Sequence, residues 1–169
     1  QENGSLGAKP SQNISFMPYV HNVDSFGYNS AIIKPRIPYE TESWSMLLDE
    51  ASHGKTAIVN DPTIGIFDLI LATQAKGLVE YKDIGNLSIQ EIDAFFEVLY
   101  TYKREGHFRG YWNSVPQSVD FMKSGEVSIQ SMFSPAVSAL KGMGVPCLYA
   151  APKEGYRAWY GVPFKRVFT

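Results

Sequence analysis

Short apolar runs alternate with longer amphipathic segments along most of the 169-residue chain. The apolar runs are bounded by Gly, Pro, Asn and Ser, as short buried strands are, and the longer segments carry apolar residues at helical spacing. After a β-rich stretch at 16–33 that Gly27 interrupts, the predicted strands lie at 55–60, 108–112, 127–133, 146–150 and 157–162. The predicted helices lie at 43–51, 62–76, 88–104, 114–123 and 134–142. Strands that alternate with helices predict an α/β fold, a sheet covered by helices.

Helix-start signals support these boundaries. Ser88 and Glu91 form a Ser-x-x-Glu capping box, which predicts a helix beginning at that point. Asp61 precedes Pro62, and Ser134 precedes Pro135. A capping side chain followed by proline is typical of the first turn of a helix, where the missing proline N–H costs nothing.

Composition and charge exclude several classes of protein. The net charge is −2 and the pI about 5.9, so no basic field is available and we expect no nucleic-acid partner. The apolar runs are shorter than the roughly 18–20 residues of a membrane-spanning helix, so we expect no membrane insertion. Residues 1–15 are polar and are predicted to be a flexible lead-in, with one domain over 16–169. The chain begins without Met or a signal peptide, as a mature form or a fragment would.

Several large or sulfur-containing residues are predicted to fill the core. Trp44 and Trp112 lie within apolar segments, and Cys147 lies in the run from Val145 to Ala150. A single cysteine has no internal disulfide partner, so we expect a small buried hydrophobe.

Candidate binding residues gather at two junctions where a strand ends and a helix begins. Asn60, Asp61 and Thr63 form the first, and Phe133 and Ser134 form the second. Open α/β sheets bind ligands along the carboxyl ends of their strands, where helix N-termini also present unpaired N–H groups. Asn60, Thr63 and Ser134 are therefore candidate hydrogen-bonding partners of a ligand. The alternative is that Asp61 and Ser134 only cap their helices, and both roles can coexist.

Near the last predicted strand, Trp159 is a candidate stacking surface, as Phe133 is at its junction. Core packing is the alternative for both. Glu154 and Arg157 could fix a charge on a ligand, or they could shape their own loop. The residues alone leave these alternatives open.

No pattern points to catalysis, a metal or a cofactor. His21, His53 and His107 are scattered without metal-ligand spacing. There is no Gly-x-Ser-x-Gly nucleophile elbow, no phosphate loop and no Gly-x-Gly-x-x-Gly. We therefore predict a protein that is not an enzyme and has no catalytic residues, metal site or cofactor; a hydrolase or transferase is the disfavoured alternative.

Eight short motifs follow one another in a fixed order between residues 16 and 159. They are Pro18-Tyr19, Gly27-Tyr28-Asn29, Ser43-Trp44 with Leu47-Leu48, Gly54-Lys55, Asn60-Asp61-Pro62, Gly125-Glu126-Val127, Phe133-Ser134 and Pro152-Lys153-Glu154-Gly155 with Trp159. In order and spacing the chain resembles the spermidine/putrescine-type family of extracellular solute-binding proteins, which serve ABC importers.

The resemblance implies a fold, a partner and a location. Family members have two α/β lobes that close on a ligand, and the matched region corresponds to the second lobe. We therefore expect a single three-layer lobe of the type-II periplasmic binding-protein fold, with a mixed sheet flanked by helices. Its partners would be a small organic solute, a first lobe and an ABC permease. The resemblance implies a periplasmic or extracellular location, and the chain itself leaves a cytoplasmic one open.

The resemblance also bears on the ligand. Polyamine binders place acidic residues after the second strand and beside the final tryptophan, and the equivalent positions here are Pro62, Gly65 and Gly161. The aromatic positions, Phe133 and Trp159, are retained. The resemblance therefore predicts a site that is not a standard polyamine site.

Two hypotheses remain from the sequence. In the first, the lobe binds a solute through Asn60, Thr63, Ser134 and Trp159, with Asp24 as a replacement charge. In the second, a lone lobe acts as an interaction or structural module and forms a homodimer through its uncovered cleft face.

Overall fold

The structure, a computed structural model, describes residues 20–161. They fall into two units: 24–157 form the larger one, and 20–23 and 158–161 belong to the smaller one. The predicted lead-in at 1–15 lies outside the described residues.

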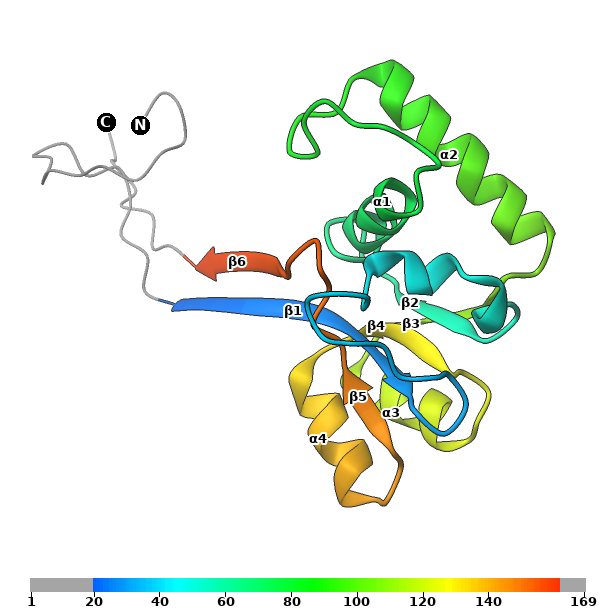
Figure 1. The fold of residues 1–169 in the computed structure, drawn as a ribbon, viewed down its shortest axis with the longest axis vertical. Coiled ribbons are helices and arrows are strands. Elements are labelled where there is room, and N and C mark those ends of the chain that lie inside the picture. The colour runs from blue at the N-terminus through cyan, green and yellow to red at the C-terminus, as the bar shows by residue number, and fades with distance from the viewer. Residues whose placement is uncertain (1–19, 162–169) are drawn as a thin grey trace, which may run out of the picture. The chain divides into compact units, whose positions relative to one another are not determined.

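Within residues 20–161, six strands and four α-helices follow one another (Figure 1). The strands are β1 (Val20–Asn29), β2 (Thr56–Val59), β3 (Phe108–Trp112), β4 (Ile129–Met132), β5 (Cys147–Tyr149) and β6 (Arg157–Gly161). The helices are α1 (Gly65–Ala75), α2 (Ile89–Arg104), α3 (Val115–Lys123) and α4 (Ser134–Gly142). The predicted short helix at 43–51 is a pair of 3₁₀ helices, η1 (Trp44–Leu48) and η2 (Glu50–Ser52).

The strands form one mixed sheet in the order β3-β2-β4-β1-β5, and β6 pairs with β1. β2 runs parallel to both β3 and β4. β1 runs antiparallel to β4 and β5. This arrangement confirms the predicted mixed sheet.

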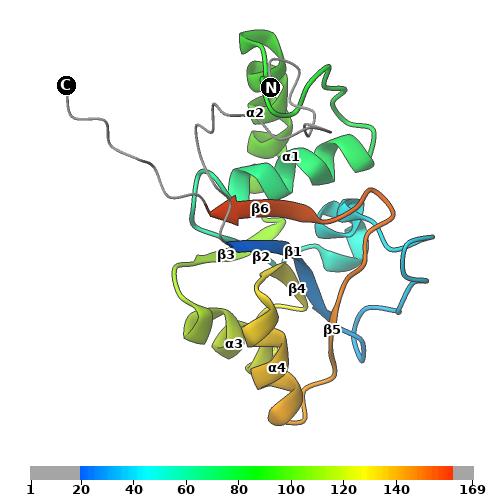
Figure 2. The ribbon, with the colours of Figure 1, turned by 90° about the vertical axis from the view of Figure 1, so that its left-hand side faces the viewer.

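Helices cover both faces of the sheet in the larger unit. Figures 1 and 2 show α1, α2 and η1 on one side and α3 and α4 on the other. The first side packs around Phe26, Trp44 and Phe95, and the second around Met132 and Cys147. The predicted core residues Trp44, Trp112 and Cys147 are each no more than 1% exposed. The three-layer α/β prediction is confirmed.

Two details of the sequence prediction were wrong. α1 begins at Gly65 and not at Pro62, because the Asp61 carboxylate accepts the N–H groups of Thr63 and Ile64 and holds a turn there. Gly27 does not interrupt β1: a side chain at that position would begin 2.5 Å from Met132 Sδ, so glycine lets β1 and β4 pack closely. The capping box of α2 is confirmed, with both reciprocal hydrogen bonds present.

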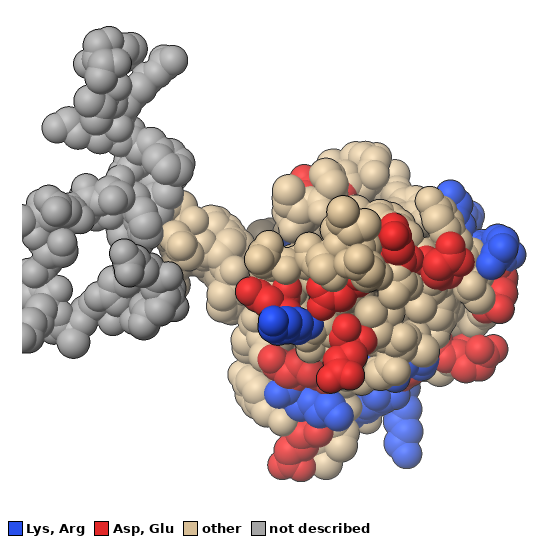
Figure 3. Space-filling view, turned by 90° about the horizontal axis from the view of Figure 1, so that it is seen from above, with Lys and Arg blue, Asp and Glu red and all other residues tan. Residues whose placement is uncertain are grey.

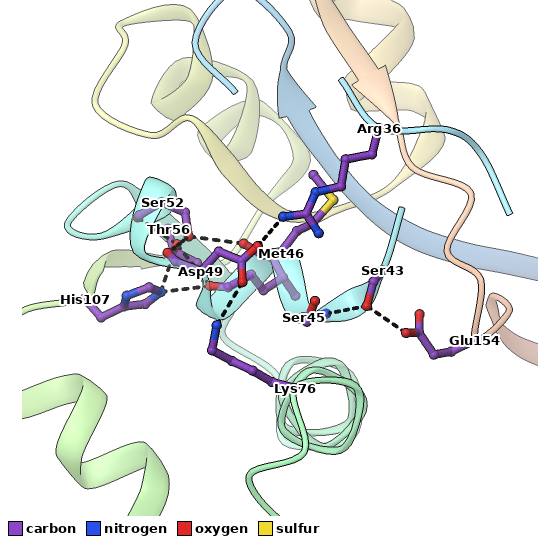
Figure 4. A network of polar contacts seen from close by, with 11 residues as sticks. Arg36, Ser43, Ser45, Met46, Asp49, Ser52, Thr56, Lys76, His107 and Glu154 are labelled. Carbon is purple, nitrogen blue, oxygen red and sulfur yellow. Dashed lines mark hydrogen bonds and ion pairs between the residues drawn. The ribbon is translucent and has the colours of Figure 1, made fainter. Parts of the chain in front are cut away.

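A polar network fastens the 3₁₀ helices to their neighbours (Figure 4). Buried His107 Nε2 lies 2.8 Å from the Leu47 carbonyl oxygen, to which it donates. Burial lowers the pKa of His107, which favours this neutral donor form. Asp49 pairs with Arg36 and with Lys76, the residue that follows α1. These contacts hold structural elements together and lie away from the strand junctions singled out by the sequence.

No helix of residues 20–161 is long and apolar enough to cross a membrane.

Candidate functional site at the carboxyl ends of the parallel strands

The carboxyl ends of β2, β3 and β4 lie along one edge of the sheet. Val59 is opposite Trp112 in the parallel pair of β2 and β3, and Ala57 is opposite Gln130 in the parallel pair of β2 and β4. The residues that follow these strands, Asn60, Asn113 and Phe133, therefore emerge at the same edge. The structure thus brings both predicted junctions together and adds a third.

Asn113 is the site residue that sequence reasoning missed. Asn60 Nδ2 donates to Asn113 Oδ1 over 2.8 Å, and both side chains are exposed. The Asn113 backbone N–H donates to Gln117 in the first turn of α3. The available signal was its position directly after the predicted strand at 108–112, which matches the position of Asn60.

Thr63 lies in the turn before α1, where its hydroxyl and backbone N–H both donate to Asp61 Oδ1, at 2.6 and 2.7 Å. These hydrogen bonds lower the pKa of Asp61, so its carboxylate stays ionised at neutral pH. Thr63 is exposed, but its hydroxyl hydrogen is committed to Asp61, which leaves the Thr63 oxygen as an acceptor for a ligand.

At the end of β4, Phe133 is the N-cap residue of α4 and makes no side-chain cap hydrogen bond. Its ring packs edge-on against Trp112, with centroids 5.4 Å apart at 90°. Ser134 is the first helical residue and is exposed. Within the described chain no group hydrogen-bonds its hydroxyl, so the capping interpretation of Ser134 was wrong.

A hollow of about 190 Å³ opens beside Asn60 at this edge, between β2, the turn before α1 and Tyr111. A larger hollow of about 500 Å³ lies between the loop at 33–41 and the 3₁₀ helices. None of the residues lining the larger hollow follows a parallel strand, and its Asp49 and Arg36 are already paired with each other. Position and free polar groups therefore favour the smaller hollow as the candidate site.

Three helices, α1, α3 and α4, are the next elements after these strand ends. Each helix N-terminus carries unpaired N–H groups and roughly half a positive charge. At α1, the Asp61 carboxylate accepts two of these N–H groups, those of Thr63 and Ile64. The edge as a whole favours oxygen acceptors on a ligand over ammonium groups.

Gly65 shows why no acidic side chain stands at that position. A side chain there would begin 2.1 Å from the Val59 carbonyl oxygen and 2.9 Å from the Ile58 side chain. The first turn of α1 packs directly on the backbone of β2, and a carboxylate at 65 does not fit this approach.

We expect Gly65→Ala to lower the free energy of unfolding by about 1–3 kcal/mol, because α1 must move away from β2. The matched control is Gly142→Ala at the end of α4, where an added Cβ meets nothing within 4 Å. That change should be neutral or stabilise by up to about 1 kcal/mol. Urea unfolding of both variants measures the difference, and equal stabilities would contradict the close packing.

Beneath the same edge lies a buried cluster of charged side chains. Arg157 Nε donates to Asp68 Oδ1 over 2.7 Å, and Arg157 Nη1 lies 3.5 Å from Asp24 Oδ2. Asp68 is fully buried and Asp24 is 3% exposed. Burial raises the pKa of Asp68 to about 6, although the Arg157 guanidinium lowers it. Ser131 lies close enough to lower this pKa as well, yet its hydroxyl falls outside hydrogen-bond geometry with Asp68 Oδ2.

Among the other predicted residues, Asp24 lies beside the site edge, because its neighbour Ser25 pairs with Met132 at the end of β4. Glu154 accepts hydrogen bonds from the Ser43 hydroxyl (Figure 4) and from the Trp44 N–H, so it ties its loop to the start of η1. Trp159 on β6 is 42% exposed and belongs to the smaller unit. Its stacking role stays a prediction.

Comparison with known proteins places this geometry in a recognised fold. No protein-family model matches the sequence, and no curated protein matches it. Solved structures do match the fold, and several of them are ABC transporter substrate-binding proteins. The fold is that of one lobe of an ABC-importer substrate-binding protein.

Three of these structures illustrate the match. The spermidine/putrescine substrate-binding protein PotD of Streptococcus pneumoniae, in complex with calcium and HEPES, has a TM-score of 0.64 at 14% identity, over 86% of this chain and 40% of its own. An ABC transporter from Clostridium perfringens has a TM-score of 0.66 at 15% identity, over 90% and 44%. MotA of A. tumefaciens, in complex with glucopine, has a TM-score of 0.61 at 19% identity, over 80% and 40%.

The chain thus spans about two fifths of the length of these binding proteins. At this level of identity the likeness shows the fold alone.

Proposed function

We propose that this chain is a solute-binding lobe, equivalent to the second lobe of an importer's binding protein, and that its solute contacts the carboxyl edge of β2, β3 and β4. The observation that carries the proposal is the convergence of Asn60, Asn113 and Ser134 at this edge, beside a hollow of about 190 Å³. Exposed amide and hydroxyl groups at strand ends suit hydrogen bonding to a small organic molecule.

The same edge argues against a standard polyamine ligand. Ammonium groups need carboxylate partners in a site that excludes water. Gly65 has no room for a carboxylate, and Asp61 Oδ1 already accepts hydrogen bonds from Thr63 and Ile64. The N-termini of α3 and α4 add positive potential. We therefore propose a solute that presents oxygen acceptors and is neutral or anionic.

The proposal extends to partners and location. We propose that the lobe works with a second lobe and delivers its solute to an ABC permease outside the cytoplasm, since the solved structures of this fold include ABC transporter substrate-binding proteins. The site residues that we propose act by binding alone, without catalysis or a cofactor.

Calorimetric titration of the 169-residue chain tests the ligand class. We expect no tight binding of spermidine or putrescine, and binding of at least one member of a panel of small organic acids and sugars. Tight polyamine binding would overturn the proposed class. If no member of the panel binds, and the chain forms a dimer that covers the edge residues, the alternative of a homo-oligomeric structural module would be favoured.

For a solute that binds, we expect Asn60→Ala to weaken affinity by about tenfold, since a buried hydrogen bond to a polar group is worth about 1 kcal/mol or more. Asn86→Ala is the matched control, because Asn86 is exposed but lies in the loop before α2, away from the strand ends. Equal losses of affinity in both variants would show that Asn60 does not contact the solute.

A further inference from the structure

α2 is attached to the rest of the larger unit by a narrow strip of its surface. Phe95 is its only buried residue, at 1% exposed, and Leu99 and Tyr102 are half-buried beside it. At 100° per residue these three lie on one side of the helix. Figures 1 and 2 show α2 at the outer margin of the helical layer, with α1 between it and the sheet.

A second apolar strip lies on the exposed side of α2. Ile89, Ile92, Phe96 and Tyr100 are 73%, 37%, 36% and 54% exposed. Their spacing of three, four and four residues places them in one row along the helix, which we name the outer stripe. Three of the four lie about 100–140° round the helix from Phe95, and Ile92 lies about 60° from it, so the row faces largely away from the core on which Phe95 packs. A contiguous row of exposed large apolar side chains marks an interaction surface more often than scattered single residues do.

Charges of opposite sign flank the two halves of the outer stripe. Asp93 and Glu97 accompany its first half, and Lys103 and Arg104 follow its end. None of the ion pairs recorded within the described part of the chain involves Asp93, Glu97 or Lys103. Figure 3 views the molecule from this side and shows uncharged surface among acidic and basic side chains. The helix thus presents an acidic and a basic half along one apolar row.

We propose that the outer stripe is the contact between two copies of this chain, with the two α2 helices antiparallel about a two-fold axis near Phe96. A two-fold interface must be self-complementary, and this charge order is complementary to its own reverse. With Phe96 on the axis, Ile92 of one copy lies opposite Tyr100 of the other, and Ile89 lies opposite the aliphatic stem of Lys103. Asp93 then lies within about 6 Å of the other copy's Lys103 along the axis, at 1.5 Å per residue.

The size of this contact sets the expected strength. α2 is 16 residues long, about 24 Å. One pair of helices of this length buries less than the roughly 1,000 Å² of a stable specific interface, so the dimer should dissociate on dilution. This dimer is independent of solute binding and uses α2, not the cleft face.

Sedimentation equilibrium of the 169-residue chain over a wide concentration range tests the contact. We expect a reversible monomer–dimer equilibrium, and a dissociation constant raised at least about tenfold by Phe96→Asp, which puts two carboxylates on the axis. Ile89→Glu, at the most exposed position, is the second variant. Ile37→Asp is the control, since Ile37 is 55% exposed but lies in the loop after β1. Circular dichroism and thermal melting verify that each variant is folded.

A charge exchange tests the antiparallel geometry. Asp93→Lys alone and Lys103→Glu alone should each weaken the dimer, and the double variant should restore it toward the original dissociation constant. A chain that stays monomeric at every concentration overturns the proposal. A dimer that Phe96→Asp does not weaken, or single charge variants that the double variant fails to rescue, overturns it equally.

Discussion

Replacing Arg157 with alanine is expected to lower the free energy of unfolding by about 3–5 kcal/mol, the usual cost of breaking a buried ion pair by removing one partner. Arg157 is the guanidinium partner of fully buried Asp68 and also pairs with Asp24. Without Arg157, Asp68 must either stay charged in an apolar environment or take up a proton. Both cost free energy at neutral pH, because burial already disfavours the ionised carboxyl.

The matched control is Arg109→Ala. Arg109 pairs with Glu126 at the surface, where the two side chains are 49% and 44% exposed. Water screens such a pair, so its loss should cost less than about 1 kcal/mol. Urea unfolding at neutral pH measures both variants. A similar small loss in each would contradict the role of Arg157 as the counter-charge of the buried cluster.

This cluster lies where the chain enters and leaves the larger unit. Asp24 and Arg157 are the first and last residues of that unit. Arg157 pairs with Asp68 of α1, and Asp24 pairs with Arg157. α1 in turn begins directly after the site turn that contains Asn60 and Thr63. The segments at the ends of the unit are therefore anchored to the helix that follows the candidate site.

Much of the fold follows from local signals. The capping box at Ser88 and the proline-marked starts near Asp61 and Ser134 depend on residues a few positions apart, and the helices begin within a few residues of these signals. The carboxyl edge could also be predicted, because a polar residue directly after a buried strand marks it. Asn113 fits that rule but was hidden by the capping signal of Ser114, which follows it.

Other features depend on contacts that local patterns do not contain. The Arg157–Asp68 hydrogen bond joins residues 89 positions apart. The sequence contained one hint of this hydrogen bond, because Asp68 is the only charged residue between Pro62 and Lys76. The apolar pattern of α2 predicted an amphipathic helix correctly, but periodicity alone could not show that Phe95 faces the core while Ile89 and Phe96 face outward. The crowding at Gly65 likewise depends on how closely α1 approaches β2.

The pH dependence of stability should carry a recognisable contribution from Asp68. In the folded protein the pKa of Asp68 is raised to about 6, whereas in the unfolded chain an aspartate titrates near 4. Between these values the folded protein binds more protons than the unfolded chain does. Stability should therefore fall as the pH rises from about 4 to 6, by about 3 kcal/mol for a shift of two units.

Asp68→Asn isolates this contribution, because asparagine keeps the shape and an acceptor oxygen for Arg157 but does not titrate in this range. Urea unfolding of the original and variant chains at a series of pH values gives the difference in stability as a function of pH. Asp61 and Glu91, whose pKa values are lowered by hydrogen bonds, act in the opposite direction: they lose stabilisation as the pH falls through their folded pKa values. Asp61 and Glu91 are present in both chains, so their contributions cancel in the difference in stability between the two. We expect the variant to gain stability relative to the original as the pH rises from 4 to about 6, and the difference between the two to stay constant above that. A difference that does not change across this window would show that Asp68 titrates normally, and that Arg157 fully offsets its burial.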